Sequence, residues 1–259
     1  MAAELKSTSQ GRTMVLTLSN PQHRNALGPE MYAAGVEALS VAESSTDVRS
    51  VVIAGEGKVF SAGGNLQRLQ ANRQQPPEVQ AQSIEGLHSW IEAIRTFPKP
   101  VIAAVEGAAA GAGFSLALAC DFLVAAEDAV FVMAYSNVAL SPDGGATWSL
   151  GRALPRQLVS EMLMAGERIG ARRLHELGVV NRVSSTGGAL TEALALAEIL
   201  NSRAPNVLSS IKELMSEAAE TTFSRQLASE RDHFVRNLHH ANAGIGINCF
   251  LAKRPPEYE

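Results

Sequence analysis

The segment KPVIAAVEGAAAGAGFSLALACD, residues 99–121, carries the pattern on which the predicted fold depends. Its first part, residues 100–107, is mostly apolar and rich in β-branched side chains, which is typical of a buried strand. Glycine and alanine follow, and an apolar stretch resumes at Gly111, which indicates a helix directly after a tight turn. Only 14 uncharged residues lie between Glu106 and Asp121, fewer than the ~20 that span a bilayer, so the segment is interpreted as buried core.

Strands and helices are predicted to alternate on both sides of this segment, and the C-terminal part of the chain is predicted to be almost wholly helical. Runs of β-branched residues predict strands at 13–18, 48–55, 121–126 and 129–133, and apolar spacing predicts helices at 29–43 and 79–96. The polar segment before residue 82 contains Pro76 and Pro77 and is expected to be a mobile loop. Further helices are expected at 190–203, 206–219 and 223–240. The chain is therefore predicted to be α/β, with a core over residues 1–195 and a helical region over 196–259.

Composition excludes several classes of protein. The 259 residues are 46% hydrophobic and 19% charged, which is ordinary for a globular chain and excludes disorder and collagen-like repeats. The net charge of −4 provides no general surface for nucleic acid or an anionic membrane, so neither is expected as a partner. Cys120 and Cys249 form no CxxC pair, and residues 1–12 hold no apolar segment behind a basic end, so a cytoplasmic location is expected.

Two glycine-rich loops hold the first chemical signal. FSAGGNL at 60–66 follows a predicted strand, and GAAAGAG at 107–113 lies between a predicted strand and a helix. Residues this small let ligand atoms reach the main chain, and N–H groups at a helix start carry partial positive charge. Two such amides that converge on a carbonyl oxygen form an oxyanion hole, in which one donor is worth ~3 kcal/mol of barrier. Each loop alone is more often only a tight turn, and neither has the spacing of a dinucleotide or P-loop motif.

Several segments together resemble the enoyl-CoA hydratase/isomerase (crotonase) family. They cover nearly the whole chain in the family's order: NPQHRNAL (20–27), GEGKVFSAGGNL (55–66), KPVIAAVEGAAAGAGFSLALACD (99–121), AVFVMAYSNVALSPDGGATWSL (129–150), ARRLHELGVVNRV (171–183) and FLAKRPPEY (250–258). The resemblance implies a crotonase (ClpP-like) spiral of ββα units and a C-terminal helical trimerisation region, giving a homotrimer or a hexamer made of two trimers. It also implies an acyl-CoA thioester substrate and no separate cofactor, since coenzyme A is carried by the substrate.

The resemblance also places the site on particular residues. The two oxyanion-hole amides fall on Gly64 and Ala112, and alanine keeps the backbone donor although family members generally have glycine there. Arg24, with Lys253 or Arg254 from the C-terminal region, is implied to meet the phosphates of coenzyme A. Other residues along the path of coenzyme A are implied to be Ala26, Ala62, Gly63, Asn65, Leu66 and Gly111.

Departures from the family pattern decide the expected reaction. Family hydratases use two glutamates to activate water, and those positions hold Ser115 and Tyr135. The resemblance therefore implies that Ser115 lies in the pocket and that Tyr135 is among the catalytic residues. Neither a serine nor a tyrosine hydroxyl can replace a carboxylate as the base that activates water near neutral pH, so simple water addition is disfavoured. A carboxylate stands instead at Asp143, where it resembles the single catalytic carboxylate of crotonase-type isomerases, notably the phenylacetate-pathway isomerase. The expected chemistry is an isomerisation, in which the oxyanion hole holds an enolate while Asp143 moves a proton between two carbons.

Other interpretations of these residues stay open. From the residues alone, Asp143 is equally compatible with a cap of the helix that follows. The chain also resembles alternative-type oxepin-CoA hydrolases and the 4-chlorobenzoyl-CoA dehalogenase branch, whose aspartate nucleophile falls on Asp143. His88, otherwise an ordinary polar residue of its helix, and Tyr135 are compatible with that site, so hydrolysis or ring opening of an aromatic-derived thioester is an alternative.

Two further alternatives are a residual enoyl-CoA hydratase and a non-catalytic homologue that binds coenzyme A or RNA. No metal is expected, because no carboxylate or cysteine completes a recognisable ligand set with the C-terminal histidines. These histidines are expected at the surface or at an interface, and they are His233, His239 and His240.

Overall fold

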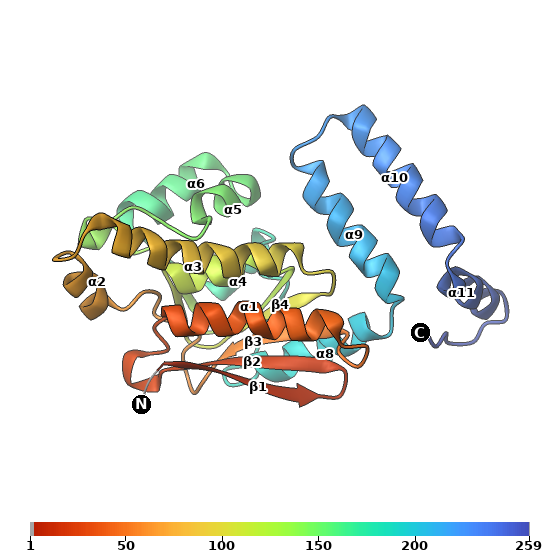
Figure 1. Cartoon of the computed structure of the whole chain (residues 1–259), viewed down its shortest axis with the longest axis horizontal. Helices are drawn as coiled ribbons and strands as arrows, with labels where there is room; N and C mark the ends of the chain where they lie inside the picture. Colours follow the sequence, from red (N-terminus) through yellow and green to blue (C-terminus); the bar gives the residue numbers. More distant parts are fainter. Residues whose placement is uncertain (1–2, 259) are drawn as a thin grey trace.

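The computed structural model describes residues 3–258, whose strands form two sheets (Figure 1). Within these residues, the larger sheet consists, in spatial order, of β1 (Glu4–Gln10), β2 (Thr13–Ser19), β3 (Ser50–Gly55), β4 (Val101–Val105), β6 (Phe122–Ala126) and β9 (Arg182–Ser184). The smaller sheet consists of β5 (Ala108–Ala110), β7 (Val130–Val132) and β8 (Arg168–Gly170). Neighbouring strands run parallel, except that β1 pairs antiparallel with β2 and β8 with β7.

Helices make up most of the remaining described chain. In chain order they are α1 (Pro29–Ser44), α2 (Leu66–Asn72), α3 (Pro77–Thr96), α4 (Ala112–Ala119), α5 (Ala146–Ala153), α6 (Arg156–Ser160), α7 (Ala171–Glu176), α8 (Ala189–Asn201), α9 (Pro205–Ala218), α10 (Phe223–Leu238) and α11 (Ala241–Leu251). Short segments between them are η1 (Pro21–His23), η2 (Ser136–Val138) and a π-helical turn, η3 (Glu161–Ala165).

Helices cover both faces of the larger sheet, and the alternation along β3 shows why. Successive side chains of a strand point to opposite faces. Val51 and Ile53 face a core shared with α1 and α3. Val52 and Ala54 face the other way, toward α8. Because both faces are buried, β3 is apolar over most of its length, as expected from the sequence.

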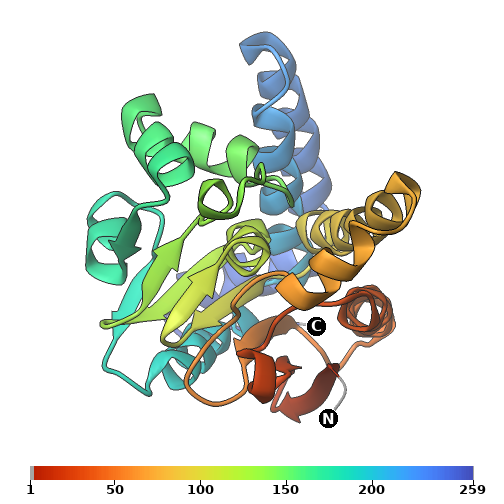
Figure 2. The ribbon, with the colours of Figure 1, turned by 90° about the vertical axis from the view of Figure 1, so that its left-hand side faces the viewer.

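The segment around residues 99–121 forms β4, β5 and α4, and it is buried core as expected. Figure 2 shows α4 near the middle of the molecule, with α3 on one side and α5 and α6 on the other. α4 is apolar all around, which suits a helix that is enclosed on every side. Among residues 3–258, no helix is both long enough and apolar enough to cross a membrane.

One expectation from the sequence is wrong, and an edge strand was not predicted. The segment before residue 82 is not a mobile loop, because it contains α2 and the start of α3. Asn65 caps α2 by accepting hydrogen bonds from the N–H groups of Gln67 and Arg68, and Pro77 occupies the first position of α3, where its missing N–H costs nothing. The sequence also did not predict β1, which is largely exposed on the edge of the sheet and held by its pairing with β2.

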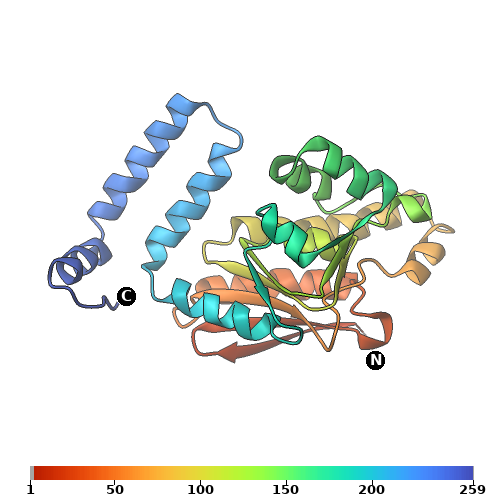
Figure 3. The same ribbon diagram turned by 180° about the vertical axis from the view of Figure 1, so that it is seen from behind.

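Helices α9, α10 and α11 extend away from the α/β part of the chain (Figure 3). Lys212 of α9 ties them to it, with its Nζ 2.7 Å from Asp121 Oδ2 and 2.9 Å from the Ile94 carbonyl oxygen. His233 of α10 is only 5% exposed, so this histidine is buried within the chain rather than placed at its surface. Large apolar side chains of these helices are nevertheless exposed, among them Met215, Phe223, Phe234, Phe250 and Leu251.

Candidate active site

The two glycine-rich loops lie side by side. Ser61 donates its N–H to the Ala108 carbonyl oxygen at 3.0 Å, and the Ala110 N–H donates to the Ser61 carbonyl oxygen at 2.9 Å. The first loop therefore runs parallel to β5 and continues past the start of α4. At Gly63, where φ is +85°, a Cβ atom would lie 2.5 Å from the Ala110 carbonyl oxygen and 3.2 Å from the Ala112 nitrogen. Only glycine permits this approach of the two main chains.

The amides assigned to the oxyanion hole are both free to bind a ligand. Within residues 3–258, neither the Gly64 N–H nor the Ala112 N–H has a hydrogen-bond acceptor. Both residues line the same cavity. Ala112 is the first residue of α4, so its amide belongs to the positively polarised end of that helix. Two unpaired donors on adjacent loops are what the binding of a thioester oxygen requires.

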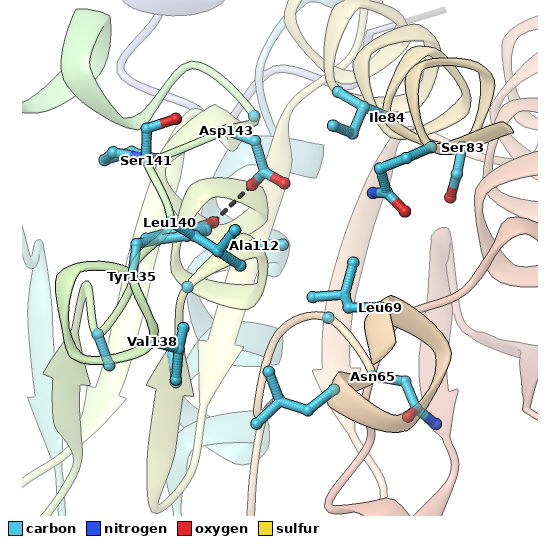
Figure 4. Close-up of a pocket in the computed structure, with 18 of the residues that line it drawn as sticks. Asn65, Leu69, Ser83, Ile84, Ala112, Tyr135, Val138, Leu140, Ser141 and Asp143 are labelled. Carbon is cyan, nitrogen blue, oxygen red and sulfur yellow. Dashed lines mark hydrogen bonds between the residues drawn. The ribbon is translucent and has the colours of Figure 1, made fainter. Parts of the chain in front are cut away.

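The cavity next to these amides has a volume of about 570 Å³. Figure 4 shows Tyr135, Leu140, Ser141 and Asp143 on one wall, and Ser83 and Ile84 of α3 on the wall across from them, with Leu69 of α2 below. Much of the lining is apolar, with a few polar side chains among it, which is typical of a site for a small organic group.

Asp143 is held in this cavity by two neighbours. The Tyr135 hydroxyl donates to its Oδ1 at 2.5 Å, as drawn in Figure 4. Beneath the loop, the Ser115 hydroxyl donates to the Asp143 carbonyl oxygen at 3.0 Å. A Cβ atom on Gly144 would lie 2.8 Å from Ser115 Cβ, so the loop rests directly on this small side chain. Asp143 is not a helix cap, because α5 begins after Gly145 and has no side-chain cap.

Ser115 therefore supports the site without lining it. Its side chain is buried, with 1% exposure, and the sequence-based placement of Ser115 in the pocket is wrong. The reason is that the loop carrying Asp143 occupies the space above position 115. A carboxylate in the cavity thus comes from this loop and not from α4.

Two tyrosines of the cavity remain protonated through the neutral range. Burial, followed by the charge and the hydrogen bond of Asp143, raises the pKa of Tyr135, so its hydroxyl stays a donor. Burial likewise raises the pKa of Tyr32 to about 12, opposed by the charge of Arg68. Among the described residues that line the cavity, Asp143 is the only carboxylate and His88 the only imidazole. The site thus contains one carboxylate that can act as a base, Asp143, and the neutral hydroxyl of Tyr135 holds it by a hydrogen bond.

The structure brings several of the other predicted residues together and leaves some apart. Ala26 and Gly63 are buried immediately behind the lining, where the Gly63 carbonyl oxygen accepts from the Leu27 N–H at 2.7 Å. Arg24 and Lys253 are exposed and lie outside the lining, so their contact with coenzyme A stays a prediction. Besides Gly64, Ala112, Tyr135, Asp143 and His88, the predicted residues that line the cavity are Ala62, Asn65, Leu66 and Gly111.

Sequence reasoning missed a group of polar residues on the cavity wall, namely Tyr32, Arg68, Gln80 and Ser83. Two of them, Arg68 and Gln80, lie in the segment before residue 82 that was expected to be a loop. Asn65 directly before Leu66 was a usable helix-start signal, because a side-chain acceptor before an apolar residue is typical of a helix start. No group of three or more histidine, cysteine or acidic side chains within residues 3–258 is arranged to hold a metal ion.

Comparison with known proteins identifies the family. Residues 8–259 match the family model described as enoyl-CoA hydratase/isomerase. The chain belongs to this family. It is 34% identical to the 1,2-epoxyphenylacetyl-CoA isomerase of Escherichia coli K12, covering 95% of this chain and 94% of that one. It is 32% identical to the 2,3-dehydroadipyl-CoA hydratase of the same organism, covering 99% of both chains.

Solved structures agree with this assignment. The crystal structure of an enoyl-CoA hydratase from Polaromonas sp. JS666 has a TM-score of 0.98 and 71% sequence identity, covering 99% of this chain and 100% of that chain. The chain therefore has the crotonase fold with a C-terminal helical region, and it is an enoyl-CoA hydratase/isomerase family enzyme that acts on acyl-CoA. The relatives include both isomerases and hydratases, so the family alone does not select the reaction.

Proposed function

We propose that this enzyme isomerises an acyl-CoA thioester, by shifting a double bond or rearranging a ring, with Asp143 as the proton carrier. The observation that carries the proposal is the lone carboxylate of the described cavity lining, which the Tyr135 hydroxyl holds at 2.5 Å. Water addition in this family uses two glutamates, whereas an isomerisation needs one base that gives its proton back. The similarity to an isomerase of epoxyphenylacetyl-CoA supports the same choice.

The reaction can be written for a 3-enoyl thioester. Asp143 takes a proton from C2, and the electron pair of that C–H bond moves toward the thioester oxygen, which the Gly64 and Ala112 amides stabilise as an enolate. The proton then returns from Asp143 to C4, where the electron pair of the C3–C4 double bond forms the new C–H bond. The electrons of the enolate restore the thioester carbonyl and form the double bond between C2 and C3. No atom is gained or lost, and no further cofactor is needed. Tyr135 keeps the carboxylate oriented in both halves of the reaction.

Product analysis in heavy water tests this mechanism. Purified enzyme is incubated with matched 2-enoyl- and 3-enoyl-CoA thioesters, and the products are analysed by mass spectrometry. A shifted double bond with deuterium and without added water is expected. Asp143→Asn should remove turnover and leave thioester binding intact, whereas Asp128→Asn, on an exposed turn outside the cavity, should keep both. A mass gain of one water would assign hydration instead, and binding without any turnover in wild type would assign a non-catalytic role.

Hydrolysis or ring opening of an aromatic-derived thioester is the second candidate, because His88 lines the same cavity as Asp143. In this route an Asp143 oxygen attacks a ring carbon of the substrate, the C–O bond of the ring breaks, and the ring oxygen leaves with the electron pair and takes up a proton. Water then attacks the carboxyl carbon of the resulting ester, which frees the Asp143 carboxylate and leaves a hydroxyl group on the substrate carbon. A single turnover in ¹⁸O-labelled water would therefore leave the label in the Asp143 carboxylate. An unlabelled Asp143 peptide in a reacting sample would exclude the ester and support the proton transfer.

We also propose that residues 196–259 assemble the enzyme into a homotrimer or a hexamer of two trimers. The exposed apolar side chains of α9, α10 and α11 support this, because a large apolar surface marks an association site. Light scattering after gel filtration should give three or six times the 27.4 kDa of one chain. Phe234→Glu should lower that mass, and a wild-type enzyme that elutes as a monomer would contradict the assembly.

A further inference from the structure

A half-buried cation lines the cavity without an acidic partner. Arg68 lies in the first turn of α2, and its Nη2 donates to the Ser83 hydroxyl oxygen at 2.8 Å. Within residues 3–258, no carboxylate oxygen comes within 4.0 Å of its guanidinium. Glu30 Oε2 and Arg68 Nη1 would each lie 3.1 Å from a Cβ atom on Gly28, but the two atoms are more than 4.0 Å from each other. A half-buried arginine is usually paired with a carboxylate. The guanidinium of Arg68 has five N–H donors, and the Ser83 hydroxyl oxygen accepts from one of them, so other donors are available for a ligand.

The protein holds Arg68 in this position rather than leaving it mobile. The Asn65 side chain caps α2 and accepts from the Arg68 main-chain N–H at 3.2 Å. Ser83 of α3 holds the other end of the side chain, and Tyr32 of α1 lies close enough for the Arg68 charge to act on its hydroxyl. The guanidinium is therefore fixed between three helices, which lowers the entropy lost when it binds an anion.

The wall that contains Arg68 holds several polar side chains among apolar ones such as Ile84, and it lies across the cavity from the reacting groups. Figure 4 shows Ser83 on the opposite side from Asp143 and Tyr135. Gln80 and Tyr32 also line the cavity. A plain hydrocarbon tail against this wall would take the polar groups out of water without giving them partners, which is costly. A carboxylate would instead accept two parallel hydrogen bonds from the guanidinium.

We propose that the acyl group of the substrate ends in a carboxylate and that Arg68 binds it. The inference rests on the proposed function, because it assigns the substrate class of the same cavity. Arg68 acts on specificity and not on the chemical step, since the thioester end is held by the amides of Gly64 and Ala112. The natural substrate is then the monothioester of an unsaturated dicarboxylic acid.

Binding of saturated thioesters tests the inference without requiring turnover. Dissociation constants are measured by calorimetry for pairs of equal chain length with and without a terminal carboxylate, from succinyl- and butyryl-CoA up to suberoyl- and octanoyl-CoA, together with free coenzyme A. The variants are Arg68→Met, Arg68→Lys, which keeps the charge, and Arg73→Met as the control. Arg73 lies at the end of the same helix, is exposed and does not line the cavity.

At one or more chain lengths, wild type should bind the carboxylate-terminated thioester about tenfold more tightly, as expected for one desolvated charge pair. Arg68→Met should abolish this preference, Arg68→Lys should keep part of it, and Arg73→Met should leave it unchanged. A wild type that binds both members of every pair equally well would overturn the inference while the acyl-CoA site stands. Equal weakening of both members and of free coenzyme A by Arg68→Met would place Arg68 on coenzyme A and overturn it as well. Failure to bind any thioester would remove the proposed function too.

Discussion

Replacing Gly63 by alanine probes the contact between the two loops that hold Gly64 and Ala112, whose amides are proposed to form the oxyanion hole. The main chain at Gly63 has φ +85°, which costs a residue with a side chain about 1–2 kcal/mol of folding stability. The new Cβ would also lie 2.5 Å from the Ala110 carbonyl oxygen and 3.2 Å from the Ala112 nitrogen. A main-chain atom cannot rotate away as a side chain can, so the two loops must separate. The Gly64 and Ala112 amides then no longer converge on one oxygen.

Gly57→Ala is the matched control for this substitution. Gly57 has φ +76°, and nothing lies within 4 Å of the position that its Cβ would take. It therefore reports the backbone strain alone, about 1–2 kcal/mol, and should keep full activity. Gly63→Ala should lose the same stability plus the cost of the clash, and its kcat should fall about 10²–10³-fold, the usual effect of one lost oxyanion donor.

The assay combines two measurements on the same samples. Urea denaturation gives the free energy of unfolding of each variant, and the rate at which the shifted double bond forms from saturating 3-enoyl-CoA thioester gives kcat. Both variants are compared at a temperature well below their unfolding transitions. If Gly63→Ala matched Gly57→Ala in both stability and kcat, the close contact of the loops and its role in catalysis would be refuted.

The remaining predictions concern the support of the site and its stability. Ser115→Glu, which reintroduces a hydratase-type side chain, should displace the loop at Gly144, cost about 1–3 kcal/mol of stability and abolish isomerisation without creating hydration, as product analysis would show. Tyr32 stays protonated in the fold until about pH 12 but ionises near pH 10 when unfolded, so its contribution to the free energy of unfolding falls by about 1.3 kcal/mol from pH 9 to 11. Tyr32→Phe should remove that part of the alkaline decline in urea titrations. Lys212→Met should remove the ammonium partner of Asp121, whose side chain is 23% exposed and keeps the Val101 N–H as a donor, and cost about 1–3 kcal/mol in thermal unfolding, with part recovered by adding Asp121→Asn.

Local patterns along the chain predicted most of the individual strands and the long helices, whereas the crotonase arrangement of these elements followed only from the resemblance to the family. The run at 48–55 predicts β3 because both faces of that strand are buried, which leaves an almost unbroken apolar signal. The glycines at 63 and 111 mark places where only a residue without a side chain can adopt the required backbone. The segment at 66–82 was misjudged for two reasons. α2 has only seven residues and no buried apolar face, so it leaves no periodic signal, and its start is set by the Asn65 cap. Pro76 and Pro77 indicated a loop, although Pro77 in fact begins α3.

The sequence by itself determined which chemical groups are present: two glycine-rich loops, and an aspartate at position 143 in a chain that has serine and tyrosine at the positions of the family's two glutamates. Only the tertiary structure decided which groups share a cavity. Ser115 was predicted to lie in the pocket, but the loop at 142–145 lies above it and keeps it out of the lining. Arg68 had no role in the sequence analysis, and only the packing of α2 against α3 places it in the cavity beside Ser83. The physical reason is that a motif describes neighbours along the chain, whereas a site depends on contacts between residues far apart in it. Those contacts follow from the packing of whole helices and sheets, which no short segment encodes.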